Sequence, residues 1–361
     1  MNDDFNLNDI LFYKGFLLLF ISLFITFFIT SKYFKKINIG KDIYNEKRKV
    51  HSWHAYRLGF LPIIIPLILS LSFMNYNSPF LKFILISCIP LFIVTIYEDI
   101  TLKGRILPRL LSTILAVFLL IAFSGHYLKD VDITWLNNLL SIKSIGIIIT
   151  IFGISATVNA WNFIDGLNGL SSGMGIIVIS SFTILAHKYN IIPHVDYLLP
   201  LVLVIFGFWI INIFSGKIFL GDTGAYFIGI IIGWTGVTLT NLSDRISAWT
   251  IFLIIIYPAT ELTLTFIRRI ISGNSPFKPD DRHFHSLFYT TLNLTFKKQS
   301  PFLINSLSGL IILTLGFLPS VFSIIYSDNY KTTQVLIIIF ICLFILLNYA
   351  ISIYLKRINT E

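Results

Sequence analysis

Long, almost uncharged apolar segments recur along the whole chain and limit the folds that it can adopt. A helix that spans a bilayer needs about 20 mainly apolar residues. Such runs lie near residues 11–31, 58–76, 79–97, 106–124, 144–163, 170–187, 196–214, 222–241, 246–267, 302–326 and 333–355. Strands of a membrane β-barrel would instead be about 10 residues of strict alternation. We therefore expect an all-α polytopic membrane protein whose runs form eleven transmembrane helices.

Composition agrees with this class, because 55% of the 361 residues are hydrophobic and only 12% are charged. Such a balance excludes the water-soluble enzyme classes. The first run follows Asn2, Asp3 and Asp4 and lacks a small-residue cleavage pattern, which indicates a retained helix rather than a signal peptide. With no internal repeat or low-complexity linker, a single domain over residues 1–361 is expected.

Basic residues predict the orientation, since Lys and Arg in short loops stay on the cytoplasmic side. They gather in alternate loops, beginning with the segment Lys32–Arg57. This bias places the N-terminus outside and the C-terminus in the cytoplasm. It also accounts for the net charge of +9, together with attraction to anionic membrane lipid. Nucleic acid is not an expected partner, because no reader motif accompanies the basic loops.

Polar islands interrupt the apolar runs at a few points. They are Glu98-Asp99, Asp165 with Asn168, Asp222, the segment Asp280–His285 and the basic segment Arg48–Arg57. With eleven helices, all of these islands fall on the cytoplasmic side. The shared side supports a single active site at that face of the membrane.

The residue types in these islands suit phosphate chemistry with a divalent metal. Mg²⁺ usually takes one or two protein carboxylates and completes its shell with water and substrate phosphate. Asp222 begins a run in Gly-Asp-Thr-Gly, where free N–H groups of a helix start favour phosphate oxygens. Basic side chains could neutralise phosphoryl charge, and one carboxylate of Glu98-Asp99 could act as base or nucleophile.

Together these motifs resemble the polyprenyl-phosphate N-acetylhexosamine-1-phosphate transferases of glycosyltransferase family 4, in the branch that initiates O-antigen and teichoic acid synthesis. Asn159–Leu170 is similar to the family's Asn-Ala-x-Asn-x-x-Asp-Gly-x-Asp-Gly-Leu, and Gly221–Gly224 to its Gly-Asp-x-Gly. Pro279–His285 resembles the Pro-Asp-Arg-x-His-x-His-His loop with one extra residue. Arg48–His51 resembles the basic loop, and Glu98-Asp99 stands at the acidic pair.

The resemblance implies that a UDP-N-acetylhexosamine gives its sugar 1-phosphate to undecaprenyl phosphate and releases UMP. It implies Mg²⁺, with Mn²⁺ as an alternative, on Asp222 and Asn162. Glu98 or Asp99 would deprotonate the lipid phosphate or carry a covalent intermediate. The enzyme would lie in the bacterial inner membrane with its site on the cytoplasmic face, and the resemblance allows a homodimer.

The remaining site residues follow from the same resemblance. The resemblance makes Asp165 and His283 catalytic candidates. Asp165 and Asn168 would read uridine, while His283 and His285 would contact phosphate or sugar. Further substrate contacts are expected from Lys49, His51, Arg57, Asn159, Asp281 and Arg282. The chain departs from the family pattern at four positions, with Asn168 in place of Asp, Glu98 in place of the first Asp, Phe60 in place of a Gly, and Ser286 in place of the last His.

Other interpretations stay open at this point. A transporter or lipid flippase also suits eleven helices, although such proteins place charges near the bilayer midplane, where here only Glu261 lies well inside a run. An inactive protein that binds nucleotide sugar is favoured by Asn168 and Glu98. Outside the motifs, His126, His187 and His194 are expected in external loops at the surface.

Overall fold

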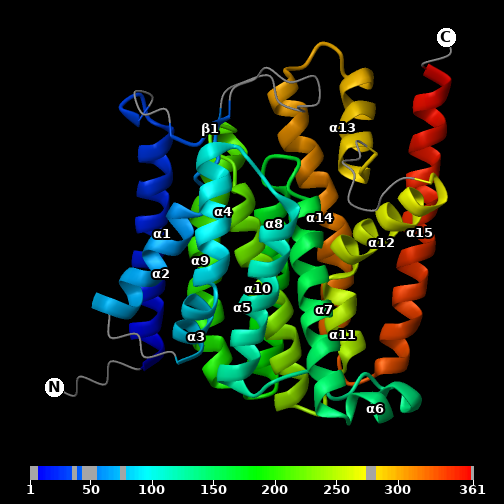
Figure 1. The fold of residues 1–361 in the computed structure, drawn as a ribbon. Helices are drawn as coiled ribbons and strands as arrows, with labels where there is room; N and C mark the ends of the chain where they lie inside the picture. The colour runs from blue at the N-terminus through cyan, green and yellow to red at the C-terminus, as the bar shows by residue number, and fades with distance from the viewer. Residues whose placement is uncertain (1–6, 35–38, 43–54, 74–78, 274–281, 359–361) are drawn as a thin grey trace.

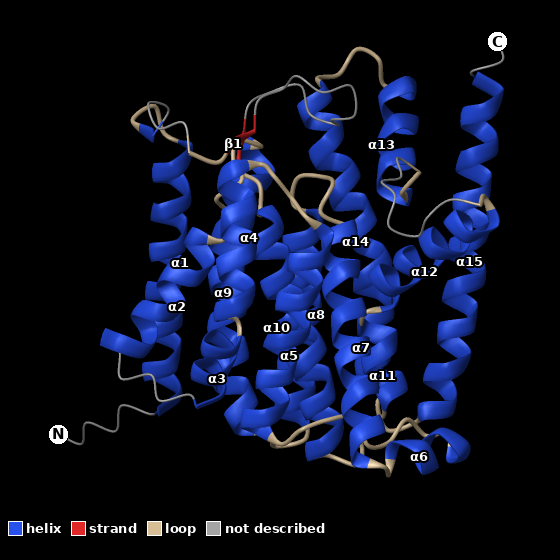
Figure 2. Cartoon of the chain, viewed as in Figure 1, coloured by secondary structure: helices blue, strands red, loops and turns tan. Residues whose placement is uncertain are grey.

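The structure is a computed structural model, and it describes residues 7–34, 39–42, 55–73, 79–273 and 282–358. Helices make up nearly all of this part of the chain (Figure 2). They are α1 (Leu7–Thr30), α2 (Leu61–Phe73), α3 (Pro79–Ser87), α4 (Ile89–Thr101), α5 (Ile106–Ser124), α6 (Thr134–Leu140), α7 (Lys143–Phe163), α8 (Leu170–Lys188), α9 (Ile192–Ser215), α10 (Gly221–Leu242), α11 (Ala248–Ile254), α12 (Ile256–Ile271), α13 (Phe284–Thr295), α14 (Pro301–Ile325) and α15 (Tyr330–Ile358). The expected all-α class is confirmed.

Each apolar run coincides with a helix or a bent pair of helices, but not every helix is long enough to cross a bilayer. Seven helices are long and apolar enough to cross a bilayer, namely α5, α7, α8, α9, α10, α14 and α15. Two bent pairs, α3 with α4 and α11 with α12, raise this number to nine within the described residues. The chain is thus a multi-pass membrane protein. The total of eleven spans and the side of each terminus stay predictions.

Helix α10 lies at the centre of the bundle, whereas α1 and α15 lie at its two flanks (Figure 1). Its most apolar window is 72% buried inside the protein, compared with 17% for α15. Neighbouring helices therefore pack around most of α10, whereas most of α15 is left to face the bilayer. This central position matters for function, because the first residues of α10 are Gly221 and Asp222.

The two bent pairs break where proline removes a backbone donor. Helix α4 has a proline in its first turn, Pro90, and it departs from α3 by 54°. Helices α11 and α12 differ by 81°, and Pro258 stands in the first turn of α12. The Ile254 carbonyl, which Pro258 cannot reach with an N–H, accepts a long hydrogen bond of 3.5 Å from Ser320 Oγ on α14. A neighbouring helix thus meets the backbone group that the break exposes.

A short ladder joins the first loop to the segment before α10. Strands β1 (Lys41–Asp42) and β2 (Ala55–Tyr56) pair antiparallel, and Tyr56 also forms a parallel bridge with Ile218. The Phe219 N–H donates to the Tyr56 carbonyl at 2.7 Å, and the Tyr56 N–H donates to the Lys217 carbonyl at 3.0 Å. The end of the basic loop is therefore held beside Asp222.

One expectation about the surface is wrong. His194 is fully buried, because α9 begins at Ile192 and includes it. Its Nε2 lies 2.9 Å from Thr238 Oγ1 on α10, so the ring links the two helices.

Candidate functional site

The carboxylate of Asp99 is bound to the start of α10. Its Oδ1 accepts a hydrogen bond from the Asp222 N–H at 2.9 Å, and its Oδ2 accepts from the Thr223 N–H at 2.9 Å and the Thr223 hydroxyl at 2.7 Å. The first N–H groups of a helix have no partner inside the helix and favour negative charge. Asp99, which is 1% exposed, thus fixes the backbone at Asp222.

Arg109, in the first turn of α5, connects Glu98 with Asp222. Its Nε lies 3.2 Å from Glu98 Oε2, and its guanidinium donates to Asp222 Oδ2 at 2.8 Å. The Arg105 N–H donates to the other Glu98 oxygen at 2.6 Å. The sequence analysis did not assign Arg109 to the site. A basic residue in the first turn of an apolar helix, a few residues after an acidic pair, was the available signal.

The end of α7 supplies the third part of the site. Asn162 Nδ2 donates to Asp222 Oδ1 at 3.1 Å, which joins the long motif to Gly-Asp-Thr-Gly. Asp165 follows in the turn between α7 and α8. Burial, and then the negative charges of Asp222 and Asp99, raise the pKa of the Asp165 carboxyl to about 8, while Arg57 opposes the shift. Three carboxylates therefore converge, and Arg57 lies close enough to act on Asp165.

The last loop contributes a pair of parallel histidines. The rings of His283 and His285 stack with centroids 5.5 Å apart. His285 is buried, and burial followed by the charge of His283 lowers its pKa to about 3, so the ring is neutral. A side chain at Gly166 would collide with His285 Nε2, which places this ring directly on the turn that carries Asp165.

Glu261 of α12 is a site residue that the sequence analysis did not assign. Its Oε1 lies 2.9 Å from His283 Nδ1 and also accepts the Phe284 N–H at 3.1 Å. The signal was its position as a buried acid inside an apolar run.

Two predicted residues are held apart from these contacts. Asn159 Nδ2 donates to the Ser155 carbonyl of its own helix at 2.7 Å. Asn168 turns toward α14, where its N–H donates to Asn305 Oδ1 at 2.8 Å and its Nδ2 to Ser306 Oγ at 3.3 Å. The substrate contacts expected of both residues stay predictions. Arg282 is exposed at the start of the described last segment, whereas Lys49, His51 and Asp281 lie outside the described residues.

The cluster fits a hard divalent cation bound together with phosphate. In the part of the chain that the structure describes, no three His, Cys, Asp or Glu side chains hold a metal by themselves. Mg²⁺ commonly needs fewer, because water and phosphate complete its shell. The Asp222 side chain keeps 23% of its surface exposed. A cation there would offset the negative charges that, together with the larger effect of burial, raise the pKa of Asp165.

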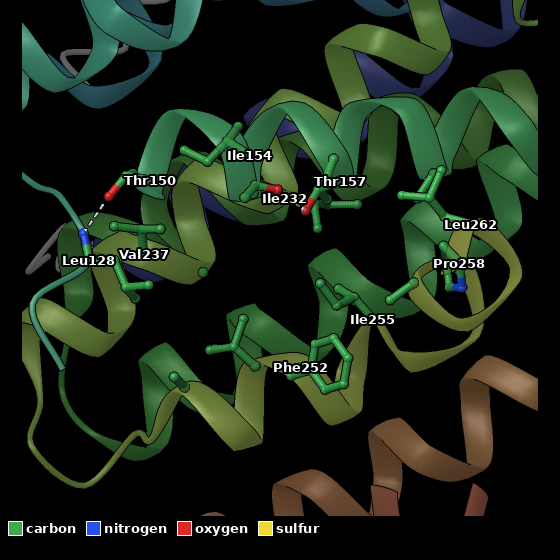
Figure 3. A pocket seen from close by; sticks show the side chains of 18 of the residues that line it. Leu128, Thr150, Ile154, Thr157, Ile232, Val237, Phe252, Ile255, Pro258 and Leu262 are labelled. Carbon is green, nitrogen blue, oxygen red and sulfur yellow. Dashed lines mark hydrogen bonds between the residues drawn. The ribbon is translucent and has the colours of Figure 1, made fainter. Parts of the chain in front are cut away.

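An apolar groove of about 320 Å³ leads away from the site between α7, α10, α11 and α12 (Figure 3). Leu128 and Thr150 line one end, and Pro258 and Leu262 line the other. Ala160 and Trp161, which precede Asn162, also line it. The groove thus follows α7 as far as Trp161, the residue before Asn162.

Comparison with known proteins agrees with these motifs. Residues 81–240, which include Glu98, Asp165 and Asp222, match the model of glycosyl transferase family 4. A probable undecaprenyl-phosphate N-acetylglucosaminyl 1-phosphate transferase of Bacillus subtilis is 26% identical over 315 residues, which cover 85% of this chain and 83% of the relative. The undecaprenyl-phosphate alpha-N-acetylglucosaminyl 1-phosphate transferase of Escherichia coli is 24% identical over 261 residues, covering 70% and 67%. A decaprenyl-phosphate N-acetylglucosaminephosphotransferase of Mycolicibacterium smegmatis is 28% identical over 159 residues, covering 38% and 39%. Residues 81–240 are thus similar to glycosyl transferase family 4, and the relatives that match the chain are named as polyprenyl-phosphate N-acetylglucosamine phosphotransferases.

Proposed function

We propose that this protein transfers an N-acetylhexosamine 1-phosphate from a UDP-sugar to a polyprenyl phosphate, with undecaprenyl phosphate as the acceptor. The observation that carries the proposal is the convergence of Asp99, Asp165 and Asp222 at the start of α10, with Arg109 beside them. The curated relatives are named for this reaction. Mg²⁺ would be held by Asp222 with Asn162 and would stabilise charge on the pyrophosphate.

In the reaction, an oxygen of the lipid phosphate attacks the phosphorus that bears the sugar. The bond from this phosphorus to the bridging oxygen breaks, and UMP leaves with that oxygen. One pyrophosphate replaces another, so positioning and charge stabilisation contribute most of the catalysis. Arg109, Arg57 and Arg282 would neutralise the charge on the phosphate oxygens.

The contacts favour Asp165 over the acidic pair as the group that takes the acceptor's proton. Asp99 is occupied by the start of α10, and Glu98 by Arg105 and Arg109. No hydrogen bond from the described residues reaches the Asp165 carboxylate. Asp165 lies two residues beyond the end of α7, the helix that lines one side of the groove.

The apolar groove supports a polyprenyl acceptor. A chain lying between α7 and α12 would stay in the bilayer, while its phosphate reached the end lined by Ala160 and Leu262. Both residues are close in sequence to site residues. Ala160 lies two positions before Asn162, and Leu262 directly follows Glu261.

The test is turnover by the purified protein in detergent with Mg²⁺, undecaprenyl phosphate and a panel of UDP-GlcNAc, UDP-GalNAc, UDP-QuiNAc and UDP-FucNAc. We expect UMP release and a lipid-linked product with one donor, and loss of both in EDTA. Asp244→Asn is the matched control for Asp222→Asn, because Asp244 is an exposed acid just beyond the other end of α10. Nucleotide-sugar binding without turnover would instead indicate an inactive binding protein, and absence of binding would favour a transporter.

A further inference from the structure

We infer that Glu261 is a positioning residue that fixes the ring of His283 so that Nε2 is the nitrogen presented to substrate. This inference rests on the proposed function, because it assigns a role in that site to a residue outside the family motifs. Its starting point is the 2.9 Å contact between Glu261 Oε1 and His283 Nδ1.

The environment of Glu261 shows that this contact is built into the fold. The side chain is 2% exposed and lies in the middle of α12. Its Oε1 also accepts the Phe284 N–H at 3.1 Å, the first N–H of α13. One oxygen therefore sets both the direction of α13 and the ring of the residue that precedes it. Its Oε2 has no hydrogen-bond partner among the described residues. The side-chain contact that Glu261 makes is therefore the one with His283.

Three groups hold the His283 ring in place. His285 stacks on one face with an interplanar angle of 4°, and its own ring rests on Gly166. Phe163, two residues before Asp165, lies with its ring centroid 5.3 Å from that of His283. Glu261 occupies Nδ1. The ring is thus tied to the turn that carries Asp165, although α13 follows that turn by more than a hundred residues.

These contacts leave a single nitrogen for substrate. Which ring nitrogen of a histidine serves a ligand is set by the hydrogen bond that the other nitrogen makes. With Nδ1–H donated to Glu261, Nε2 remains, and no described residue binds it. The side chain keeps 13% of its surface exposed. In the protonated ring Nε2–H donates to a phosphate oxygen, and the carboxylate balances the positive charge behind it.

A structural role for Glu261, limited to capping α13, predicts different kinetics. Glu261→Ala removes both contacts, whereas Glu261→Gln keeps an acceptor oxygen and loses the charge. If Glu261 acts through His283, we expect kcat to fall about 10²-fold in Glu261→Ala, with a smaller loss in Glu261→Gln and little change in KM for the UDP-sugar. Thr265→Val is the matched control, because Thr265 Oγ1 is a second, longer contact of the same nitrogen at 3.4 Å.

The deciding experiment is a double-mutant cycle with His283→Asn. A positioning role predicts that Glu261→Ala causes no further loss of kcat once His283 is replaced. An undiminished loss in the His283→Asn background would overturn the inference, and so would full activity of Glu261→Ala. Turnover by the wild type in the same assay separates either result from a failure of the proposed function.

A second measurement does not depend on activity. Nitrogen NMR of ¹⁵N-histidine-labelled protein, with His283 assigned through His283→Asn, reports which ring nitrogen carries the proton. We expect protonated Nδ1 in the wild type and loss of that state in Glu261→Ala. An unprotonated Nδ1 in the wild type would refute the inference even if the chain transferred no sugar phosphate.

Discussion

Both ends of the helix bundle carry interacting polar groups, which are exposed at one end and mostly buried at the other. At the end where α8 meets the α14–α15 connection, Asp328 accepts from the Tyr189 hydroxyl at 2.7 Å and pairs with Lys188 at 3.2 Å. At the other end, Asp99, Asp165 and Asp222 converge. The hydrogen bonds of Tyr189 and Lys188 lower the pKa of Asp328, whereas burial and like charge raise the pKa of Asp165 to about 8.

The pKa is lowered at Asp328 and raised at Asp165, and this difference distinguishes an aspartate with a structural role from one with a functional role. A carboxylate that its neighbours neutralise stabilises a helix connection and needs nothing further. Carboxylates crowded together raise the energy of the folded state unless a cation or a proton joins them. The crowded end is therefore the one that we expect to bind ligand, and variants at the two ends should differ accordingly.

The largest difference should appear in turnover. Asp222→Asn removes the charge that the proposed cation and Arg109 share, and we expect UMP release to fall about 10³-fold. Asp328→Asn, at the opposite end, should leave turnover unchanged. A coupled assay of UMP release in detergent measures both. Equal rates in wild type and Asp222→Asn would show that the end with the crowded carboxylates is not the active site.

Two glycines with left-handed backbone allow a comparison of stability. Gly221 has φ 76° and Gly125, at the opposite end of the bundle, has φ 71°. A Cβ at Gly221 would lie 2.8 Å from Asp99 Oδ2, whereas a Cβ at Gly125 would meet nothing within 4 Å. Gly125→Ala should cost only the backbone strain of about 1–2 kcal/mol. Gly221→Ala should cost about 3 kcal/mol or more, because the Asp99 cap of α10 is displaced as well.

Thermal unfolding of the two variants in the same detergent measures this difference. We also expect Gly221→Ala to lose UMP release while Gly125→Ala retains it. If both variants unfold at one temperature, the close packing of Asp99 on α10 does not stabilise the fold.

The raised pKa of Asp165 predicts a stability that depends on pH without divalent metal. The carboxyl has a pKa of about 8 in the folded state, whereas its ordinary pKa of 3.8 applies when the chain is unfolded. Stability from this group is therefore present at low pH and is lost as pH rises toward 8. Melting temperatures of wild type and Asp165→Asn, measured from pH 5 to 9 in EDTA, should diverge with the wild type falling more steeply. Parallel curves would show that burial and the neighbouring carboxylates do not raise the pKa of Asp165.

The smallest effect is expected at Asp328. Its pair with Lys188 is solvent-exposed, so Asp328→Asn should lower the free energy of unfolding by less than about 1 kcal/mol. Raising the salt concentration should reduce even this difference, because exposed charges are screened. A much larger loss, seen by thermal unfolding, would mean that this end is not a simple connection between helices.

Sequence reasoning found most of the site because its motifs are local. Asp222 in Gly-Asp-Thr-Gly and Asp165 in the Asn159–Leu170 motif stand out against apolar neighbours, and spacing alone identifies them. Arg109 and Glu261 were missed as site residues, since each is a single charge whose partner lies far away in sequence. Arg109 binds Asp222 across 113 positions, and Glu261 binds His283 across 22.

The sequence by itself determined that the chain lies in a lipid bilayer and that it is all-α. Lengths of apolar chain long enough to span a bilayer leave helices as the only way to satisfy their backbone groups, and the motif residues imply phosphate chemistry. The tertiary structure alone decided how each polar group is used. In the folded protein, Asp99 accepts hydrogen bonds from the start of α10, and Asn168 bonds to α14. His194 is buried, and Glu261 contacts His283 Nδ1. The reason is physical, because hydrogen bonds act over about 3 Å and depend on which helices pack together, which no local pattern specifies.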